Sequence, residues 1–262
     1  MELVLYAVIV LGALGAIFGA ILAIASKIFA VEVDPKQAAV RECLAGANCG
    51  GCGFPGCYAA AVAKGEAPVN KCVAAGPAAA EKIAEIMGVS AGESVRQVAF
   101  VPCSGTEGHA LKRFNYNGPK NCQAAMLFGG KSNMDCRFAC IGLGNCADAC
   151  QFGAMHIVDG VAKVDREQCV GCGACVDACP KNIVRLVPYD QHVEVACSSH
   201  DKGAAVNKIC DAGCIGCMKC QRECPADAIV VVDNLAKIDV TKCVQCGHCS
   251  DICPRHIIKV QN

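Results

Sequence analysis

The sequence predicts an α+β protein with one apolar helix at the N-terminus, a small helical segment rich in cysteine, and two similar units with short β-hairpins. Three observations predict this architecture. Residues 3–26 carry no charge, all 25 cysteines of the 262-residue chain follow that stretch, and one block of cysteines recurs with nearly the same spacing. We expect boundaries at residues 1–30, 31–95, 96–190 and 191–262.

Composition excludes two classes of protein. The formal net charge is zero and no basic tract occurs, so the electrostatic footprint of a nucleic-acid-binding protein is missing. The cysteine count is odd and most cysteines lie two or three residues apart, which suits disulfide geometry poorly. Closely repeated cysteines are instead typical of ligands that surround a metal centre.

The uncharged stretch is long enough to cross a bilayer. As a helix, residues 3–26 would span roughly 36 Å, against a hydrocarbon core of about 30 Å. The alternative is a cleaved signal peptide, but that would begin with positive charge and have a shorter apolar core, whereas this chain begins Met1-Glu2. We therefore expect a transmembrane helix. Gly15 and Gly19 either let a neighbouring helix approach or simply fill a lipid-facing surface.

Charge and cysteine chemistry predict the orientation of that helix. Lys27, Lys36 and Arg41 follow it and no Lys or Arg precedes it, so its C-terminal side is expected in the cytoplasm. Thiolates also persist in a reducing compartment. The predicted location is the plasma or inner membrane, single-pass, with the cysteine-rich portion cytoplasmic. Residues 31–42 are expected to form a polar tether.

Three runs have the form C-x2-C-x2-C-x3-C-P, the bacterial ferredoxin pattern for [4Fe-4S] clusters, in which the fourth cysteine ligates the other cluster of a pair. A zinc site would typically use two CxxC pairs at longer separation. The runs are Cys169-Cys172-Cys175-Cys179, Cys214-Cys217-Cys220-Cys224 and Cys243-Cys246-Cys249-Cys253.

A fourth run is defective and indicates an internal duplication. When the segment that begins at Cys136 is aligned with the one that begins at Cys210, Leu143 falls where Cys217 stands, so Cys136 is the nearest substitute ligand. Upstream, Cys103 resembles Cys197. Eighteen residues follow the last cysteine of this run before the next run, and the same spacing recurs in the second half. Each interval contains a short β segment, and Asp-Gly at residues 159–160 predicts a hairpin turn.

Exchange of the fourth ligand within each unit predicts four clusters, and the remaining cysteines predict a fifth that bridges the two halves. The alternative for these last four is that some are buried structural thiols. The expected ligand sets are Cys136, Cys140, Cys146 and Cys179; Cys150, Cys169, Cys172 and Cys175; Cys214, Cys217, Cys220 and Cys253; Cys224, Cys243, Cys246 and Cys249; and, for the bridging cluster, Cys103, Cys122, Cys197 and Cys210.

The first cysteine motif has a different spacing. Cys49, Cys52, Cys57 and Cys72 have no partner run, so we expect them to hold one cluster by themselves. Neighbouring glycines would let backbone N–H groups approach the cluster sulfurs. A thiol-redox CxxC is the alternative, but that motif usually opens a helix after a strand, and none is expected here. Residues 58–64 and 78–87 are expected to be helical.

The stretch AGANCGGCGFPGC, followed by Cys72, resembles the four-cysteine iron–sulfur domain of the B subunit of the Rnf complex, the membrane-bound ferredoxin:NAD oxidoreductase. That family also shows this order of membrane helix, four-cysteine domain and ferredoxin runs. The shortest members have one two-cluster unit, whereas this chain has two. A similar four-cysteine domain occurs in the corrinoid iron–sulfur protein, but that protein is soluble and lacks the ferredoxin array, so the resemblance to it is weaker. Position 43 is usually not a ligand in the family, so Cys43 is expected to be spare, which leaves 24 cysteines for six clusters, with five as the minimum.

The sequence contains no nucleotide-binding signature and no catalytic triad, so we expect electron transfer without substrate chemistry in this chain. The resemblance implies reduced ferredoxin as donor, membrane and flavin-bearing subunits as partners, and a complex that reduces NAD and moves Na⁺ or H⁺. The alternatives are an electron-transfer subunit of a membrane hydrogenase or formate complex, or a cluster-based redox sensor or cluster store. The histidines are expected at the surface: His109, His156, His192, His200, His248 and His256.

Overall fold

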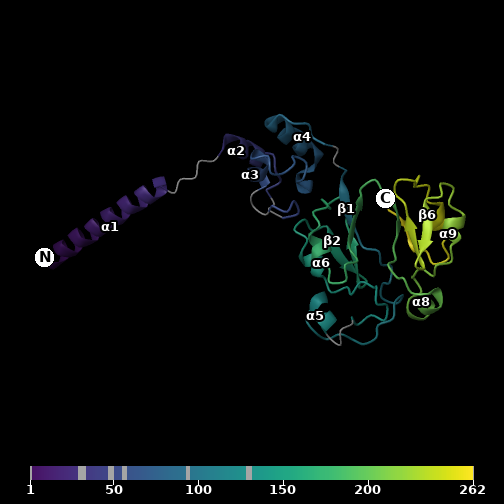
Figure 1. Ribbon diagram of the computed structural model, residues 1–262. Coiled ribbons are helices and arrows are strands. Elements are labelled where there is room, and N and C mark those ends of the chain that lie inside the picture. Colours follow the sequence, from purple (N-terminus) through teal and green to yellow (C-terminus); the bar gives the residue numbers. More distant parts are fainter. Residues whose placement is uncertain are drawn as a thin grey trace.

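The computed structural model describes residues 2–28, 34–46, 50–54, 58–92, 95–127 and 132–261. Figure 1 shows three parts in chain order: helix α1, a small helical domain made of α2, α3 and α4, and a body that contains the β-strands. The second half of the body (yellow) lies beside its first half (teal to green). The mixed helix and strand content agrees with the expected α+β class.

Helix α1 (Glu2–Ile28) stands apart from the rest of the protein (Figure 1). Its segment Ile9–Ile28 has a mean hydropathy of 2.4, and none of it is buried. Large side chains such as Leu11 and Leu22 are about 70% exposed. A helix that is apolar on all sides and buries none of them is typical of a membrane span. By length and composition, α1 can cross a membrane.

The helical domain corrects the expected tether. Helix α2 (Pro35–Glu42) begins where the Asp34 side chain accepts a 2.8 Å hydrogen bond from the Lys36 N–H, with Pro35 as the first helical residue. Val40 is fully buried against α3 and α4, so residues 35–42 belong to the folded domain. The tether prediction was wrong there because a single buried side chain gives little apolar periodicity.

The other helices of this domain match the expected segments. Helix α3 spans Tyr58–Ala63, a short 3₁₀ turn spans Val73–Ala75, and α4 spans Gly76–Met87. Val62 and Ile83, each 1% exposed, form the core with Val40. Cys43, Cys52 and Cys72 pack against this core from its edge. The domain therefore places its cysteines around a small apolar centre.

In the described part of the body, the strands form four two-stranded antiparallel sheets, and their order repeats along the chain. In each half, one pair is a local hairpin and the other joins the first strand of that half to its last. The pairs are β1 (Gln97–Phe100) with β4 (Arg185–Pro188), β2 (Met155–Val158) with β3 (Val161–Val164), β5 (Val193–Val195) with β8 (Ile258–Val260), and β6 (Ile229–Val232) with β7 (Leu235–Ile238).

Both hairpins turn through residues with positive φ. The values are 48° and 75° at Asp159 and Gly160, and 51° and 63° at Asp233 and Asn234. Two consecutive left-handed residues are the requirement of a type I′ turn, whose twist matches that of the strands. The hairpin predicted at residues 159–160 is confirmed by the pairing of Val158 with Val161.

Short helices connect these strands and carry many of the cysteines. They are α5 (Cys122–Leu127), α6 (Asn145–Asp148), α7 (Ala174–Asp177), α8 (Gly203–Ile209), α9 (Lys219–Arg222) and α10 (His248–Asp251). The body has two main apolar cores, one in each half, with the cysteines among their buried residues. Consequently the cores are built around the cysteine side chains.

Candidate metal centres

Four cavities in the body are each lined by four cysteines. We name them the Cys150 cavity (Cys150, Cys169, Cys172, Cys175), the Cys122 cavity (Cys122, Cys140, Cys146, Cys179), the central cavity (Cys103, Cys136, Cys197, Cys210) and the Cys214 cavity (Cys214, Cys217, Cys220, Cys253). The empty space between the lining residues, part of which is open to solvent, is similar in the four, at about 350, 360, 380 and 350 Å³ respectively. Four cavities of one size and one donor set suit four copies of one bound group.

The donor chemistry of these cavities fits an iron–sulfur cluster. The soft thiolate ligand of Fe–S clusters is cysteine, four to a [4Fe-4S] cluster. Within the described ranges, no three His, Cys, Asp or Glu side chains converge tightly enough to hold a single metal ion. The sulfurs instead border a cavity, and the remaining lining is largely apolar. Residues and space therefore both fit a multi-atom cluster.

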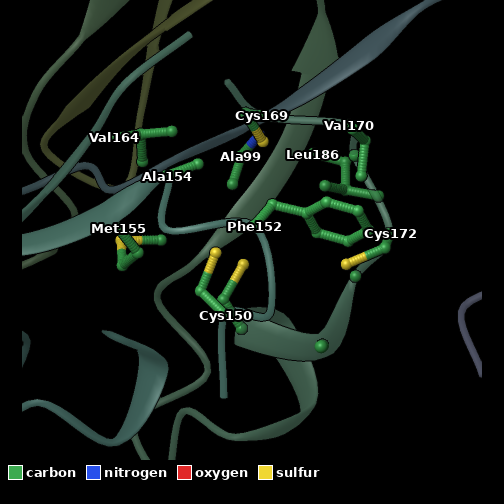
Figure 2. A pocket seen from close by; sticks show the side chains of 14 residues that line it. Ala99, Cys150, Phe152, Ala154, Met155, Val164, Cys169, Val170, Cys172 and Leu186 are labelled. Atoms are coloured by element: carbon green, nitrogen blue, oxygen red, sulfur yellow. The ribbon is translucent and has the colours of Figure 1, made fainter. Parts of the chain in front are cut away.

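The Cys150 cavity brings together cysteines from two runs, in the grouping that the sequence predicted. Cys150 follows α6, whereas Cys169 and Cys172 come from the loop before α7. Figure 2 shows their side chains around one space, with Phe152 beside them. The backbone N–H of Ala99 in β1 donates to the Cys169 sulfur at 3.3 Å. Such N–H bonds to ligand sulfurs help to set cluster potential.

The Cys122 cavity corrects one predicted ligand. The prediction placed Cys136 with Cys140, Cys146 and Cys179, whereas the structure places Cys122 there. The physical reason is a hydrogen bond between distant parts of the chain: the N–H of Cys122, at the start of α5, donates to the Asn145 side chain at 2.6 Å, directly beside Cys146. Leu143 stands where a regular run would have a cysteine, and Cys122 of α5 provides the fourth sulfur of this cavity instead.

The central cavity takes two cysteines from each half. Cys103 and Cys136 come from the first half, and Cys197 and Cys210 from the second. The structure therefore places two cysteines of each half around one cavity, as predicted, but with Cys136 in place of Cys122. The sequence did contain this signal, since the duplication aligns Cys136 with Cys210 and Cys103 with Cys197. If the two halves contribute equivalent cysteines to a shared site, this alignment places all four of these cysteines together.

Two basic residues brace the walls of the central cavity. Arg255 donates to the carbonyl oxygens of Cys210 and Gly213, at 2.6 and 3.3 Å. Lys181 donates to the carbonyl oxygen of Arg137, next to Cys136. Each basic residue directly follows a Cys-Pro that ends a ferredoxin run. The end of each run is thereby tied to the segment that carries a central-cavity cysteine.

In the second half, the structure brings together the sets that the sequence predicted. The Cys214 cavity contains the expected four cysteines. Cys224 lies near Cys243, Cys246 and Cys249. Burial raises the pKa of Cys249 to about 11, and the three neighbouring cysteines add to the rise. The Ala228 N–H donates to the Cys224 sulfur at 3.4 Å. Among the described cysteines, Cys217 and Cys246 are the exposed ones.

Burial makes these thiols poor acids in the absence of a metal. It raises the pKa of Cys146 and Cys175 to about 12, and that of Cys140, Cys197 and Cys220 to about 11, and neighbouring cysteines add to the shift. Crowded, buried thiolates repel one another and lack water. A cationic iron centre removes that cost, because metal ligation stabilises the deprotonated form. The cavities are therefore suited to thiolate ligands only when positive charge fills them.

The N-terminal set is described in part. Cys49 and Cys57 lie outside the described residues. Cys52 and Cys72 both lie close enough to Tyr58 that their thiolates would raise the pKa of its hydroxyl, although its burial is the largest cause. That hydroxyl donates to the carbonyl oxygen of Pro68 at 2.5 Å and accepts from the Lys71 N–H at 3.0 Å. Tyr58 thus holds the segment before Cys72 against α3.

The histidines lie outside the linings of the four cavities. His109 forms an exposed hydrogen bond with Asp211, with 2.7 Å between Nδ1 and Oδ1. His200 packs edge-on against Phe138, with 5.5 Å between the ring centroids. These contacts join the two halves at the surface, and the cavities themselves offer sulfur ligands.

Family models match the three cysteine-rich regions. The model described as "Putative Fe-S cluster" matches residues 44–74, which include the N-terminal set. Models described as "4Fe-4S dicluster domain" match residues 135–183, 168–228 and 213–258. The matches overlap because each regular run can serve as the first or the second member of a pair. The [4Fe-4S] type of cluster is thereby supported for both halves of the body.

Curated relatives extend the similarity to nearly the whole chain. The chain is 46% identical over 95% of its length to the B subunit of the Na⁺-translocating ferredoxin:NAD⁺ oxidoreductase complex of Acetobacterium woodii, and covers 75% of that protein. It is 42% identical to the B subunit of the ion-translocating oxidoreductase complex of Methanosarcina acetivorans, with 96% of each chain covered. The chain belongs to the B-subunit family of Rnf-type complexes. For the corresponding protein of Vibrio cholerae, the identity is 46% over 38% of this chain.

Membership assigns the class of function. Rnf B subunits are iron–sulfur electron-transfer subunits of ion-translocating oxidoreductase complexes, and this chain is one of them. A further relative, from Clostridium ljungdahlii, is 44% identical over 99% of this chain and is named for proton translocation. Relatives named for Na⁺ and for protons are thus about equally similar to it.

Proposed function

We propose that this Rnf B subunit accepts electrons from reduced ferredoxin on the cytoplasmic side and passes them to the membrane and flavin-bearing subunits of the complex. Bound [4Fe-4S] clusters supply one-electron redox chemistry, and the chain holds them, insulates them with apolar side chains and spaces them. The observation that carries the proposal is the series of four-cysteine cavities, whose ligand-bearing segments adjoin one another through the body.

Six clusters account for 24 of the 25 cysteines and leave Cys43 without one. The cavities and the N-terminal motif support these ligand sets, which revise the sequence prediction at Cys122 and Cys136. The sets are Cys49, Cys52, Cys57 and Cys72; Cys122, Cys140, Cys146 and Cys179; Cys150, Cys169, Cys172 and Cys175; Cys103, Cys136, Cys197 and Cys210; Cys214, Cys217, Cys220 and Cys253; and Cys224, Cys243, Cys246 and Cys249.

The domain limits follow from the same grouping. We assign residues 1–30 to the membrane helix, 31–95 to the four-cysteine domain, and 96–190 and 191–262 to two ferredoxin-like units that arose by duplication. The repeated strand pairing supports the duplication, since β1 with β4 corresponds to β5 with β8, and each half adds one hairpin. The central cavity, which takes an equivalent pair of cysteines from each half, supports it independently.

Exposure and charge support the direction of transfer. Cys217 and Cys246, one from each cluster of the second unit, are exposed, so a soluble donor can come close to either cluster. Lys27 lies in the last turn of α1, and Lys36 and Arg41 follow the helix, which favours a cytoplasmic body by the positive-inside tendency. Electrons would therefore enter at the second unit and leave through the four-cysteine domain next to the membrane.

The test uses the complex purified from membranes. We expect flavin-bearing partners to be recovered with this chain, and NAD reduction to depend on reduced ferredoxin. The Cys197→Ser variant should lose about four irons per chain, the content of one [4Fe-4S] cluster, with a matching loss of spin-resonance signal in the reduced protein. A chain that purifies alone and takes no electrons from reduced ferredoxin would contradict the proposal.

A further inference from the structure

We propose that electrons cross from the body to the four-cysteine domain at one point, the backbone contact between Gly51 and Cys172, and that they reach it through the cavities in a fixed order. The order is the Cys214 cavity, the central cavity, the Cys122 cavity, the Cys150 cavity and then the N-terminal set. This inference rests on the proposed function and assigns its internal route.

The contact at Gly51 is too close for any other residue. A Cβ on Gly51 would lie 2.4 Å from the carbonyl oxygen of Cys172 and 3.1 Å from its Cα. Real Cβ atoms do not approach backbone so closely, and only glycine lacks that atom. Two backbone segments from different domains therefore lie in direct contact at this point.

Both segments carry ligand cysteines. Cys52 directly follows Gly51 in the N-terminal set, and Cys172 itself lines the Cys150 cavity. Figure 2 shows Cys172 at the edge of that cavity, with its sulfur turned inward. The path from one cluster to the other thus consists of two cysteine residues, one peptide unit and a single non-bonded contact.

The body also fixes the position of Cys172. A Cβ on Gly171 would lie 2.4 Å from the carbonyl oxygen of Gln97, so the loop before α7 is pressed against β1. Gly171 has a φ of 68°, which L side chains rarely adopt. A loop held by β1 on one side presents its other side to Gly51, so the contact is a built junction between domains.

The order of the other cavities follows from shared segments. Gly213 lines the central cavity and Cys214 the next one, and the Cys214 N–H donates to the Cys197 sulfur at 3.3 Å. Ala139 lines the central cavity and Cys140 the Cys122 cavity. The central cavity therefore adjoins the Cys214 cavity on one side and the Cys122 cavity on the other.

The Cys122 and Cys150 cavities also adjoin each other through segments that contribute a cysteine to both. Cys146 and Cys179 line the Cys122 cavity, while Cys150 and Cys175, four residues away in each run, line the Cys150 cavity. Helices α6 and α7, which carry these pairs, pack against each other. The cavities therefore form a line rather than a ring, and the Cys150 cavity is the end of that line that touches the four-cysteine domain.

The test is Gly51→Ala in the full chain within the complex, with Gly92→Ala as matched control. Gly92 lies in the same domain, but a Cβ there would meet only the flexible Asn70 side chain, at 3.3 Å. Three quantities are measured: iron per chain, hydrogen exchange of the amides at residues 169–175, and the rate at which the N-terminal cluster is reduced after mixing with reduced ferredoxin and rapid freezing.

We expect Gly51→Ala to keep its iron, to expose the amides of residues 169–175 to faster exchange, and to lose the fast phase of N-terminal cluster reduction. Clusters of the body should still be reduced at the rate of the unchanged protein, and Gly92→Ala should behave like it throughout. The proposed junction is wrong if hydrogen exchange at residues 169–175 is unchanged in Gly51→Ala. It is also wrong if exchange is faster but the fast phase of N-terminal cluster reduction remains. Failure of ferredoxin to reduce any cluster in the unchanged protein overturns the proposed function instead.

A second measurement applies even if Gly51→Ala does not fold. In the fully reduced protein, magnetic interaction should broaden the signal of the N-terminal cluster. Cys169→Ser, which removes a ligand of the Cys150 cavity, should abolish that broadening, whereas Cys214→Ser should leave it unchanged. The reverse pattern, or no effect of either variant, contradicts the proposed order.

Discussion

Which cavity a cysteine lines depends on hydrogen bonds made by that cysteine or by a residue next to it. The Cys122 amide bonds to Asn145, which fixes its sulfur beside Cys146. Lys181 donates a hydrogen bond to the carbonyl oxygen of Arg137, the residue after Cys136. Cys136 lines the central cavity. Two cysteines that spacing treats as interchangeable are thereby assigned to different cavities.

Paired substitutions test this assignment. In the structural grouping, Cys103→Ser with Cys136→Ser disrupts one cavity and should remove about four irons, the content of one cluster. Cys136→Ser with Cys140→Ser disrupts two cavities and should remove about eight. Iron analysis of the two double variants provides the measurement, and each variant is the control for the other. The grouping that sequence spacing predicts gives the opposite pair of results.

Most cysteine partners could be predicted, and the exceptions have a common cause. The exchange of Cys150, Cys179 and Cys253 between runs follows from the ferredoxin pattern, because that pattern fixes both spacing and geometry. Cys122 could not be placed, because it belongs to no cysteine run and its spacing to other cysteines follows no ferredoxin pattern. Its position depends on a long-range hydrogen bond to Asn145, which no local spacing encodes.

At the scale of elements, the hairpin turns support the cysteine loops. A Cβ on Gly142 would lie 2.1 Å from the carbonyl oxygen of Gly160, in the turn between β2 and β3. A Cβ on Gly216 would lie 3.1 Å from the carbonyl oxygen of Asn234, in the turn between β6 and β7. Both glycines have positive φ, of 76° and 65°. Each turn thus forms the platform on which the loop of a ferredoxin run lies.

These two glycines predict unequal effects of one substitution. Ala at either position should cost about 1–2 kcal/mol of unfolding free energy for its left-handed backbone. Gly142→Ala should cost clearly more, since its Cβ also collides with backbone that cannot move without displacing the hairpin. The measurement is the guanidinium midpoint at which the visible absorbance of the clusters is lost. Equal midpoints for Gly142→Ala and Gly216→Ala would contradict the platform.

Element prediction succeeded where the chain carries a strong local signal. The hairpin at residues 159–160 and the helices around residues 58–64 and 78–87 are examples. Helix α2 was missed because it buries only Val40, although Asp34 followed by Pro35 is a recognised helix start. Local capping chemistry was the available signal, and apolar periodicity was not.

At the scale of the whole molecule, α1 is separate from the parts that hold the cysteines. None of its apolar segment is buried, and the body and the four-cysteine domain have cores of their own. Folding of the cysteine-rich parts should therefore not depend on the helix. The order of the three parts could be predicted from the sequence, but the contact at Gly51 could not, because it joins residues far apart in the chain.

Removal of residues 2–28 tests that independence. We expect the shortened chain to appear in the soluble fraction with unchanged iron per chain and an unchanged spin-resonance spectrum. Fractionation, iron analysis and spectroscopy are the measurements, and the full chain is the control. Loss of iron from the shortened chain would show that the helix supports folding of the cysteine-rich parts.

The central cavity also constrains how the protein is made. Its walls include Cys103 and Cys136 from early in the chain and Cys197 and Cys210 from late in it. During synthesis, the first two thiols leave the ribosome before their partners exist, whereas the Cys122 and Cys150 cavities are complete once Cys179 has emerged. A cluster held by the central cavity, as proposed above, would therefore be loaded late in biogenesis and would join the two halves as a final step.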